Sequence, residues 1–270
     1  EKINGAYVRR IDPGVFADQT ALAAVELPDS VSVVGDGAFR GCTALRAIRL
    51  PQRMQALGAS AFAGCTALQS VTIPAGLETL EAGTFFGCNA LNLVTFSEGL
   101  TAIGMECFQQ CRLLTRLVFP ESLREIRPYA FESCRSLETI ALPAGLATIG
   151  ESAFCDCTSL KTVTIPAAVT SMYLSFERCT ALKEVYFLGD APAQAETAFA
   201  GCNVTIFFQT GAAGWTTPEW HGLPAYPFPH VHNFVSQVIA PTCTEPGCIL
   251  QRCSCGESRR SDFTDPLGHA

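Results

Sequence analysis

The residues of this chain best suited to chemistry are its fourteen cysteines and four histidines. A thiolate can act as a nucleophile or bind a metal, and a neighbouring histidine can serve as its base. All four histidines, His221, His230, His232 and His269, lie in the last fifty residues, beyond ten of the cysteines. The chain also contains no glycine-rich phosphate loop. We therefore expect no enzymatic activity.

Most of the cysteines recur with a fixed spacing. Eight of them are separated by 23, 23, 23, 23, 23, 22 and 23 residues, a phenylalanine precedes each by three positions, and a leucine follows seven of them by three. An alternating aliphatic pair, and often a proline, then closes the unit. An earlier copy around Phe16 has Gln19 in place of the cysteine. The chain therefore contains nine copies of one unit, which is typical of a solenoid.

Each unit predicts one strand and one tight turn. The segment from Leu160 to Ile165 alternates near its end and is rich in β-branched residues, as strands are. The A-F-x-x-C stretch at residues 61–65 is too short for an ordinary helix, and we expect it to form one tight helical turn. One unit cannot bury enough apolar surface to fold alone. The sequence therefore predicts a β-rich solenoid of about nine ~23-residue repeats, with parallel strands and short helical turns.

We expect the recurring phenylalanines and cysteines, here called the ladder residues, to form the core. A buried thiol behaves as a small apolar side chain, which would contact a backbone group of the turn. Rungs ~4.8 Å apart place the Cβ atoms beyond the usual disulfide range, which favours free thiols over disulfides. The predicted core residues are Phe62, Phe85, Phe108, Phe131, Phe154, Cys65, Cys88, Cys111, Cys134 and Cys157.

Two further cysteines of the repeats lie outside the ladder. Cys107 takes a position that other units give to alanine, so we expect its side chain to be buried. Cys155 takes a position that other units give to Arg40, Gln109 and Glu132, so we expect it to be exposed. An exposed thiol would be the most reactive one of the repeats, although no neighbour in sequence marks it as catalytic.

Alternate residues of the predicted strands point to solvent and form an expected concave surface, here called the strand face. Most are threonine, alanine or serine, which fits a solvated β surface without a ligand. Apolar and arginine side chains there would instead suit recognition of a protein or a glycan. No ladder of aromatic residues suited to stacking on sugar rings is visible. The candidate binding residues are Arg49, Leu93, Arg116, Val118 and Tyr186.

The repeating unit resembles the BspA-type leucine-rich repeat, which occurs mainly in surface and secreted proteins of gut and oral bacteria. The pattern I-G-x-x-A-F-x-x-C-x-x-L-x-x-V-x-I-P is nearly complete at residues 149–166, and the resemblance covers residues 11 to about 208. Residues 214–227 resemble the closing segment of that family, with Trp215 and Trp220 capping the core. The resemblance implies a right-handed solenoid used for adhesion or other protein contacts rather than for catalysis.

The composition changes after the repeats. Three prolines in residues 223–229 predict a stiff linker between a capped solenoid at 1–222 and a small module at 230–270. That module resembles a short Cys/His repeat found at the ends of Firmicutes surface proteins, although His230 and Cys248 depart from its pattern. The positions that match the pattern are His232, Cys243, Cys253, Cys255 and His269.

Such a Cys/His cluster suits a zinc site, because about forty residues rarely hold a core without a metal or disulfides. The C-x-C spacing is tighter than the spacing of most structural zinc sites. The four cysteines of the tail could instead form two disulfides in an oxidising compartment, or stay reduced and free of metal. Zinc in this module is the one cofactor that the sequence suggests.

Charge and hydropathy narrow the choice of partners. A net charge of −7 argues against nucleic acid, and no apolar run approaches the ~20 residues needed to span a membrane. No signal-peptide pattern begins the sequence. From the resemblance we expect a secreted or surface-attached bacterial protein whose partner is a host or neighbouring-cell protein or glycan. The alternatives are a spacer or accessory segment of a larger surface protein, and a cytosolic scaffold, which reduced thiols would fit.

Overall fold

The structure is a computed structural model that describes residues 2–3, 6–228, 235–239, 247–252 and 258–264. The described residues form strands and turns, with no helix among them. They belong to two units, residues 1–227 and 228–270. The strands are β1 (Lys2–Ile3), β2 (Ala6–Tyr7), β3 (Arg10–Ile11), β4 (Ala24–Glu26), β5 (Val33–Val34), β6 (Ala47–Arg49), β7 (Ala56–Leu57), β8 (Ser70–Ile73), β9 (Thr79–Leu80), β10 (Leu93–Phe96), β11 (Ala102–Ile103), β12 (Arg116–Val118), β13 (Glu125–Ile126), β14 (Thr139–Ala141), β15 (Thr148–Ile149), β16 (Thr162–Ile165), β17 (Glu184–Phe187), β18 (Thr205–Gln209), β19 (Glu219–Trp220), β20 (Leu223–Phe228), β21 (Val235–Ile239), β22 (Gly247–Arg252) and β23 (Ser258–Thr264).

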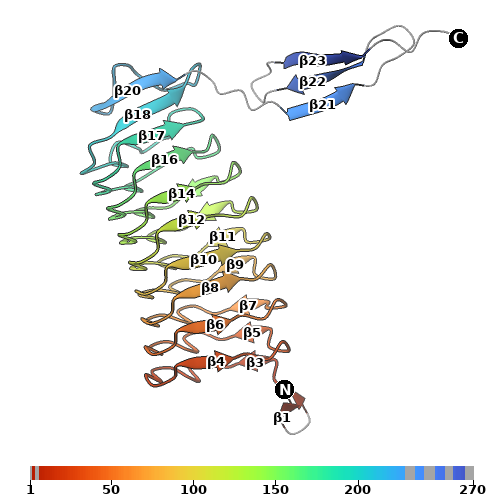
Figure 1. Cartoon of the computed structure of the whole chain (residues 1–270). Coiled ribbons are helices and arrows are strands. Elements are labelled where there is room, and N and C mark those ends of the chain that lie inside the picture. The colour runs from red at the N-terminus through yellow and green to blue at the C-terminus, as the bar shows by residue number, and fades with distance from the viewer. Residues whose placement is uncertain (1, 4–5, 229–234, 240–246, 253–257, 265–270) are drawn as a thin grey trace, which may run out of the picture. The chain divides into compact units, whose positions relative to one another are not determined.

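The first unit is a stack of coils, each of which contributes one principal strand. The principal strands follow one another in chain order from β4 to β18 (Figure 1). Paired neighbours run parallel and in register, so that Leu93 lies beside Ser70 and Thr164 beside Tyr186. A second series of two-residue parallel strands, from β3 to β15, occupies another side of the coils. The prediction of a parallel-strand solenoid built on the repeat is confirmed.

The interior holds a continuous stack of phenylalanine rings. Phe108, for example, is fully buried, and its ring centroid lies 5.2 Å from both Phe85 and Phe131, with nearly parallel planes. The same stacking extends from Phe16 in the first coil to Phe199 near the end of the stack. The ladder cysteines from Cys65 to Cys157 are also fully buried. Each coil therefore shares its interior with the coils on both sides, as a solenoid requires.

The prediction of a helical turn at the A-F-x-x-C stretch is wrong. In the turn at residues 59–65, Ser60 and Gly64 have positive φ angles of 54° and 72°, which a right-handed helix does not allow. The N–H groups of Ser60, Phe62 and Gly64 donate to carbonyl oxygens of the next coil at 2.7–2.8 Å. Alternating backbone conformation thus aims every second N–H along the stack. The turns thereby form a second hydrogen-bonded wall opposite the strands.

The glycine of the I-G pair lies against the backbone of the preceding coil, although two coils carry Glu81 and Arg127 at this position. A Cβ atom on Gly104 would lie 2.5 Å from the carbonyl oxygen of Leu80, and one on Gly150 would lie 2.5 Å from the backbone nitrogen of Pro128. Contacts this short with backbone atoms cannot be relieved by moving a side chain. The 22-residue repeat lacks this glycine, since Met172 is followed directly by Tyr173. The two-residue strand series also ends before this repeat, at β15.

The end of the first unit is closed by aromatic side chains. Trp215 stacks on Phe208 with ring centroids 5.0 Å apart, and Trp220 packs against Trp215 at 4.6 Å. The indole N–H of Trp215 donates to the carbonyl oxygen of Gly189 at 3.2 Å. These contacts cover the last coil with apolar surface, in place of a further repeat.

The expected linker at residues 223–229 is instead largely a strand. Leu223–Phe228 form β20, which lies between β18 and β19 in a five-stranded sheet. The N–H of Ala225 donates to the carbonyl oxygen of Pro218. Proline favours extended backbone and is tolerated where a strand does not need its N–H. The same residues that predict a stiff linker therefore also suit a strand that closes the cap.

The second unit contains a three-stranded antiparallel sheet in the order β21–β22–β23. The candidate metal ligands His232, Cys243, Cys253, Cys255 and His269 all lie outside the described residues. No helix capable of crossing a membrane occurs in the described part of the chain.

The assignment of the two strand faces can be tested by substitution. Thr139 on β14 is exposed, so Thr139→Ala should change the free energy of unfolding by no more than ~0.5 kcal/mol. Leu137 in the same coil is fully buried, and Leu137→Ala should cost about 2–5 kcal/mol. Urea denaturation of both variants measures the difference. A large loss for Thr139→Ala would mean that the two faces are reversed.

Candidate binding surface

The strand face is built by the alternation of side chains along the principal strands. On β12 the side chain of Leu117 points into the core, so Arg116 and Val118 on either side of it are exposed. The parallel register aligns the outward positions of neighbouring coils into two rows. One row contains Leu93 and Arg116, and the other contains Arg49, Val118 and Tyr186. All five candidate binding residues are thus carried by this face.

The structure brings three of the five candidates together. Leu93 on β10 is 56% exposed and Val118 on β12 is 52% exposed, with Arg116 beside them. Arg49 lies two coils before Leu93, where it forms an exposed ion pair with Asp29 at 3.1 Å. Tyr186 lies three coils after Arg116. The candidates therefore divide into one apolar cluster around Leu93, Arg116 and Val118 and two outlying residues.

A groove of about 490 Å³ lies between β10 and β12. The entry to each strand is normally tied to the previous coil, as where Asn92 N–H donates to Gln69 at 3.0 Å and Glu138 N–H to Thr115 at 2.9 Å. No such bond joins Thr115 N–H to Asn92, and β10 and β12 belong to different sheets, as β14 and β16 also do. The strand ladder is thus interrupted at the groove, whose walls are residues 92–96 and 115–118 without Leu117.

Two phenylalanines from neighbouring coils meet beside this interruption. Phe96 ends β10 and Phe119 follows β12, at a position that other coils give to Ile73, Ile165, Phe187 or Phe208. The ring centroids of Phe96 and Phe119 lie 5.6 Å apart, and each ring also packs edge-on against the phenylalanine stack. The strands β17 and β18 pair in register with Phe187 beside Phe208, so two aromatic rings at this position do not by themselves separate neighbouring strands.

Near the cap, Tyr186 forms an aromatic pair that the sequence analysis missed. Its ring stacks on Phe207 with centroids 5.0 Å apart, and its hydroxyl donates to the Glu184 carboxylate at 2.8 Å. The last repeat has two residues fewer between its cysteine and its strand, since Thr205 follows Cys202 by three whereas Glu184 follows Cys179 by five. Aligning the repeats by their strands rather than by their cysteines would have placed Phe207 on the strand face.

The ladder cysteines have structural rather than chemical roles. The thiol of Cys134 donates to the carbonyl oxygen of Phe108 at 3.3 Å, and that of Cys65 donates to Phe39 at 3.1 Å. The remaining ladder thiols make the same contact with the preceding coil, and the cysteines of the repeats are free. Burial raises the pKa of both Cys65 and Cys134 to about 12. A thiol held protonated in this way is a poor nucleophile.

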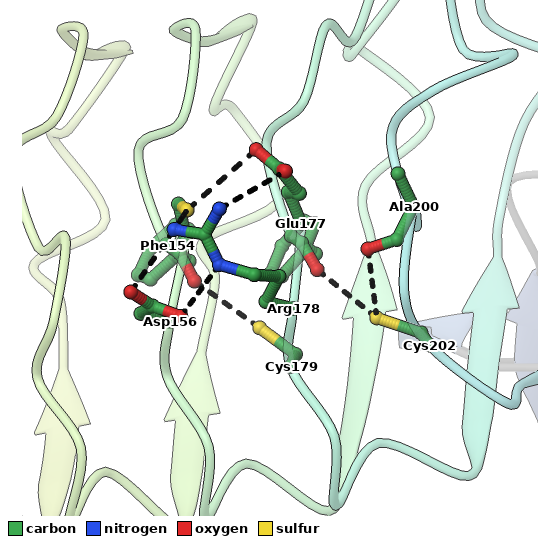
Figure 2. A network of polar contacts seen from close by, with 9 residues as sticks. Phe154, Asp156, Glu177, Arg178, Cys179, Ala200 and Cys202 are labelled. Carbon is green, nitrogen blue, oxygen red and sulfur yellow. Dashed lines mark hydrogen bonds and ion pairs between the residues drawn. The ribbon is translucent and has the colours of Figure 1, made fainter.

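Cys155 is buried, so the expectation that it is exposed is wrong. Beside it, the guanidinium of Arg178 is bonded to Asp156 at 2.8 Å and to Glu177 at 3.2 Å (Figure 2). The same guanidinium contacts the Cys155 sulfur at 3.5 Å. Burial raises the pKa of this thiol to about 12, while hydrogen bonding to Arg178 lowers the pKa of Asp156. The group forms a clamp between two coils and leaves the thiol protonated.

Comparison with known families places most of the chain in one repeat class. The model of the BspA type leucine rich repeat region, in six copies, matches residues 9–116 and 101–210. The comparison with curated proteins gave no match.

Several solved bacterial proteins are similar to this chain. A leucine-rich repeat protein from Bacteroides ovatus is 20% identical, with 82% of this chain and 76% of that one covered and a TM-score of 0.48. A leucine rich repeat protein from T. pallidum is 31% identical, with 60% and 68% covered and a TM-score of 0.46. A leucine rich cell surface protein from Faecalibacterium prausnitzii is 20% identical, with 82% and 87% covered and a TM-score of 0.31.

Proposed function

Because the chain belongs to the BspA-type leucine-rich repeat family, we propose that it is a bacterial surface or secreted protein that binds another protein through its strand face. The observation that carries this proposal is the pair of apolar side chains, Leu93 and Val118, which are more than half exposed beside Arg116. Exposed aliphatic residues next to arginine are typical of protein-binding surfaces. Adhesion to a host or to a neighbouring cell is the form of binding we propose.

The core supports this role by holding the surface rigid. Hydrogen bonds join the coils along both walls, apart from the interruption between β10 and β12, and the phenylalanine stack fills the space between the walls. A rigid surface loses little conformational entropy when a partner binds, so more of the contact energy appears as affinity. The same core suits the non-catalytic role that we propose, since burial raises the pKa of the ladder thiols and keeps them protonated.

A binding screen against immobilised extracellular-matrix proteins and mucins tests the proposal. We expect the intact chain to bind at least one of them. The double variant Leu93→Ser/Val118→Ser should bind at least about tenfold more weakly, because the loss of each exposed side chain removes of the order of 1 kcal/mol of binding free energy. The matched control is Met105→Ser/Tyr173→Ser, which removes two comparably exposed side chains from the turns. Equal loss of binding in both variants, or no binding by the intact chain, would contradict the proposal. The second result is what a pure spacer would give.

A further inference from the structure

The groove between β10 and β12 combines an apolar lining with unpaired positive charge. We infer that it docks an acidic protein segment, which inserts an apolar side chain between the two strands and pairs its carboxylates with Arg112 and Arg116. This inference rests on the proposed protein-binding function and names the chemistry of the partner. Three features of the coils at residues 92–118 carry it, namely the gap in the strand ladder, the apolar lining and the free guanidinium groups.

The gap gives the partner side chain a place to enter. Elsewhere on this face the strands are tied together at their entry, but here Thr115 N–H and Asn92 C=O have no such bond. The resulting groove of about 490 Å³ falls within the range of pockets that hold ligand groups. An aliphatic or aromatic side chain of a partner therefore fits between the strands. The separation is already present in the fold without a partner, so it need not be created on binding.

The lining of the groove selects an apolar group. Leu93 and Val118 stand on opposite walls, and the partly buried Phe96 also lines it. Leu113, three residues before β12, is 52% exposed and adds an apolar side chain to the segment that leads into this strand. Leu113 lies outside the strands, so the alternation of side chains along a strand does not reveal its exposure. Covering these side chains removes apolar surface from water, which favours binding.

Charge selects an acidic segment. Arg112 and Arg116 are exposed, and neither has a hydrogen-bond or ion-pair partner among the described residues. Some basic side chains elsewhere on the coils are neutralised, as Arg49 is by Asp29 and Lys161 by Glu138. The whole chain carries a net charge of −7, so a patch with two free guanidinium groups stands out against it. Guanidinium groups bind carboxylates through two parallel hydrogen bonds, which favours Asp or Glu beside the inserted side chain.

Selection from a library of random twelve-residue peptides displayed on phage tests this inference on the intact chain. We expect the enriched peptides to place Asp or Glu within a few positions of a large apolar residue. The consensus peptide is then synthesised with a fluorescent label, and its Kd is measured by anisotropy. Arg116→Glu and Arg112→Glu should each weaken binding at least tenfold at 50 mM salt, and by a smaller factor at 300 mM, because salt screens exposed charges. Leu93→Ser should weaken it at both salt concentrations.

The matched control is Arg46→Glu. It reverses the charge of another exposed arginine without an ion-pair partner, three coils away from Arg116. It should change Kd less than twofold. Circular dichroism and urea denaturation confirm that each variant keeps the fold. Heparin serves as a sulfated-glycan probe, and we expect its binding, if any, to be indifferent to Leu93→Ser.

Several results would overturn the inference. They are the failure of any peptide to be enriched, enrichment without an acidic bias, a Kd unaffected by Arg116→Glu, and heparin binding that depends on Leu93. Peptides whose binding is lost in Phe207→Ser but kept in Leu93→Ser would overturn this inference and leave the proposed function standing. Proteins bound in the screen but unaffected by any substitution on the strand face would overturn the proposed function itself.

Discussion

Raising the pH from 8 to about 10.5 should destabilise the whole stack of coils severely, even though its surface charges are few. A ladder thiol in an unfolded chain ionises near its usual pKa of 9.0, whereas burial raises the pKa of Cys65 and Cys134 to about 12. The stability that these protonated thiols contribute is therefore fully present below pH 9 and is lost as the pH rises toward 12. Each of the two thiols should lose about 2 kcal/mol of this stabilisation by pH 10.5.

Urea denaturation at a series of pH values, in the presence of a reductant, measures this loss. The matched variant is Cys134→Ala, which removes one thiol that releases its proton on unfolding. Its free energy of unfolding should fall with pH less steeply than that of the natural chain, by about 1.4 kcal/mol per pH unit between pH 10 and 11. Because Tyr129 and Tyr186 also have raised pKa values, the difference between the two curves isolates the thiol. Parallel curves would show that folding does not raise the pKa of Cys134.

Phe108→Ala should cost about 3–5 kcal/mol, because it leaves a cavity in the middle of the stack. The ring of Phe108 is fully buried and is held by Phe85 and Phe131 above and below, and by Phe96 at its edge. The backbone around it is fixed by hydrogen bonds to the coils on each side, so the site cannot collapse to fill the space. Urea denaturation followed by circular dichroism measures the loss.

The matched control is Phe16→Ala, at the equivalent position in the first coil. Phe16 is 36% exposed and stacks on Phe39 alone, so its removal opens no enclosed cavity and should cost about 1–2 kcal/mol. A loss below about 1 kcal/mol for Phe108→Ala would mean that the stack does not hold the coils together. Equal losses at both positions would mean that the cost comes from the single coil rather than from its neighbours.

The sequence predicts the coils well because their period is repeated nine times. Any position that must be apolar in every copy, such as that of Phe108, stands out against positions that vary, such as that of Thr139. The turn was misjudged because its conformation depends on hydrogen bonds to the next coil. Ser60 has a positive φ angle that no property of serine requires, and only the N–H groups directed at the neighbouring coil account for it.

The candidate site was only partly predictable for related reasons. The exposure of Leu93 and Val118 follows directly from strand alternation. The groove between them does not, because it depends on how two neighbouring coils pair, and the bond from Thr115 N–H to Asn92 is missing there. Cys155 was misjudged because its cover, Arg178, belongs to the following coil. Tertiary contacts between copies, rather than the pattern within one copy, decide these details.

The turns share one hydrogen-bonding scheme, and this affects how the gene can gain or lose whole repeats. Duplication or loss of one whole 23-residue copy joins equivalent ends, so each N–H of the affected turn still meets a carbonyl oxygen. Such an event would lengthen or shorten the molecule by about 4.8 Å without disturbing the remaining copies. Unequal recombination could thus move the docking groove nearer to the tryptophan-covered end or farther from it. The distance of the groove from the end of the stack would then evolve independently of the residues that bind the partner.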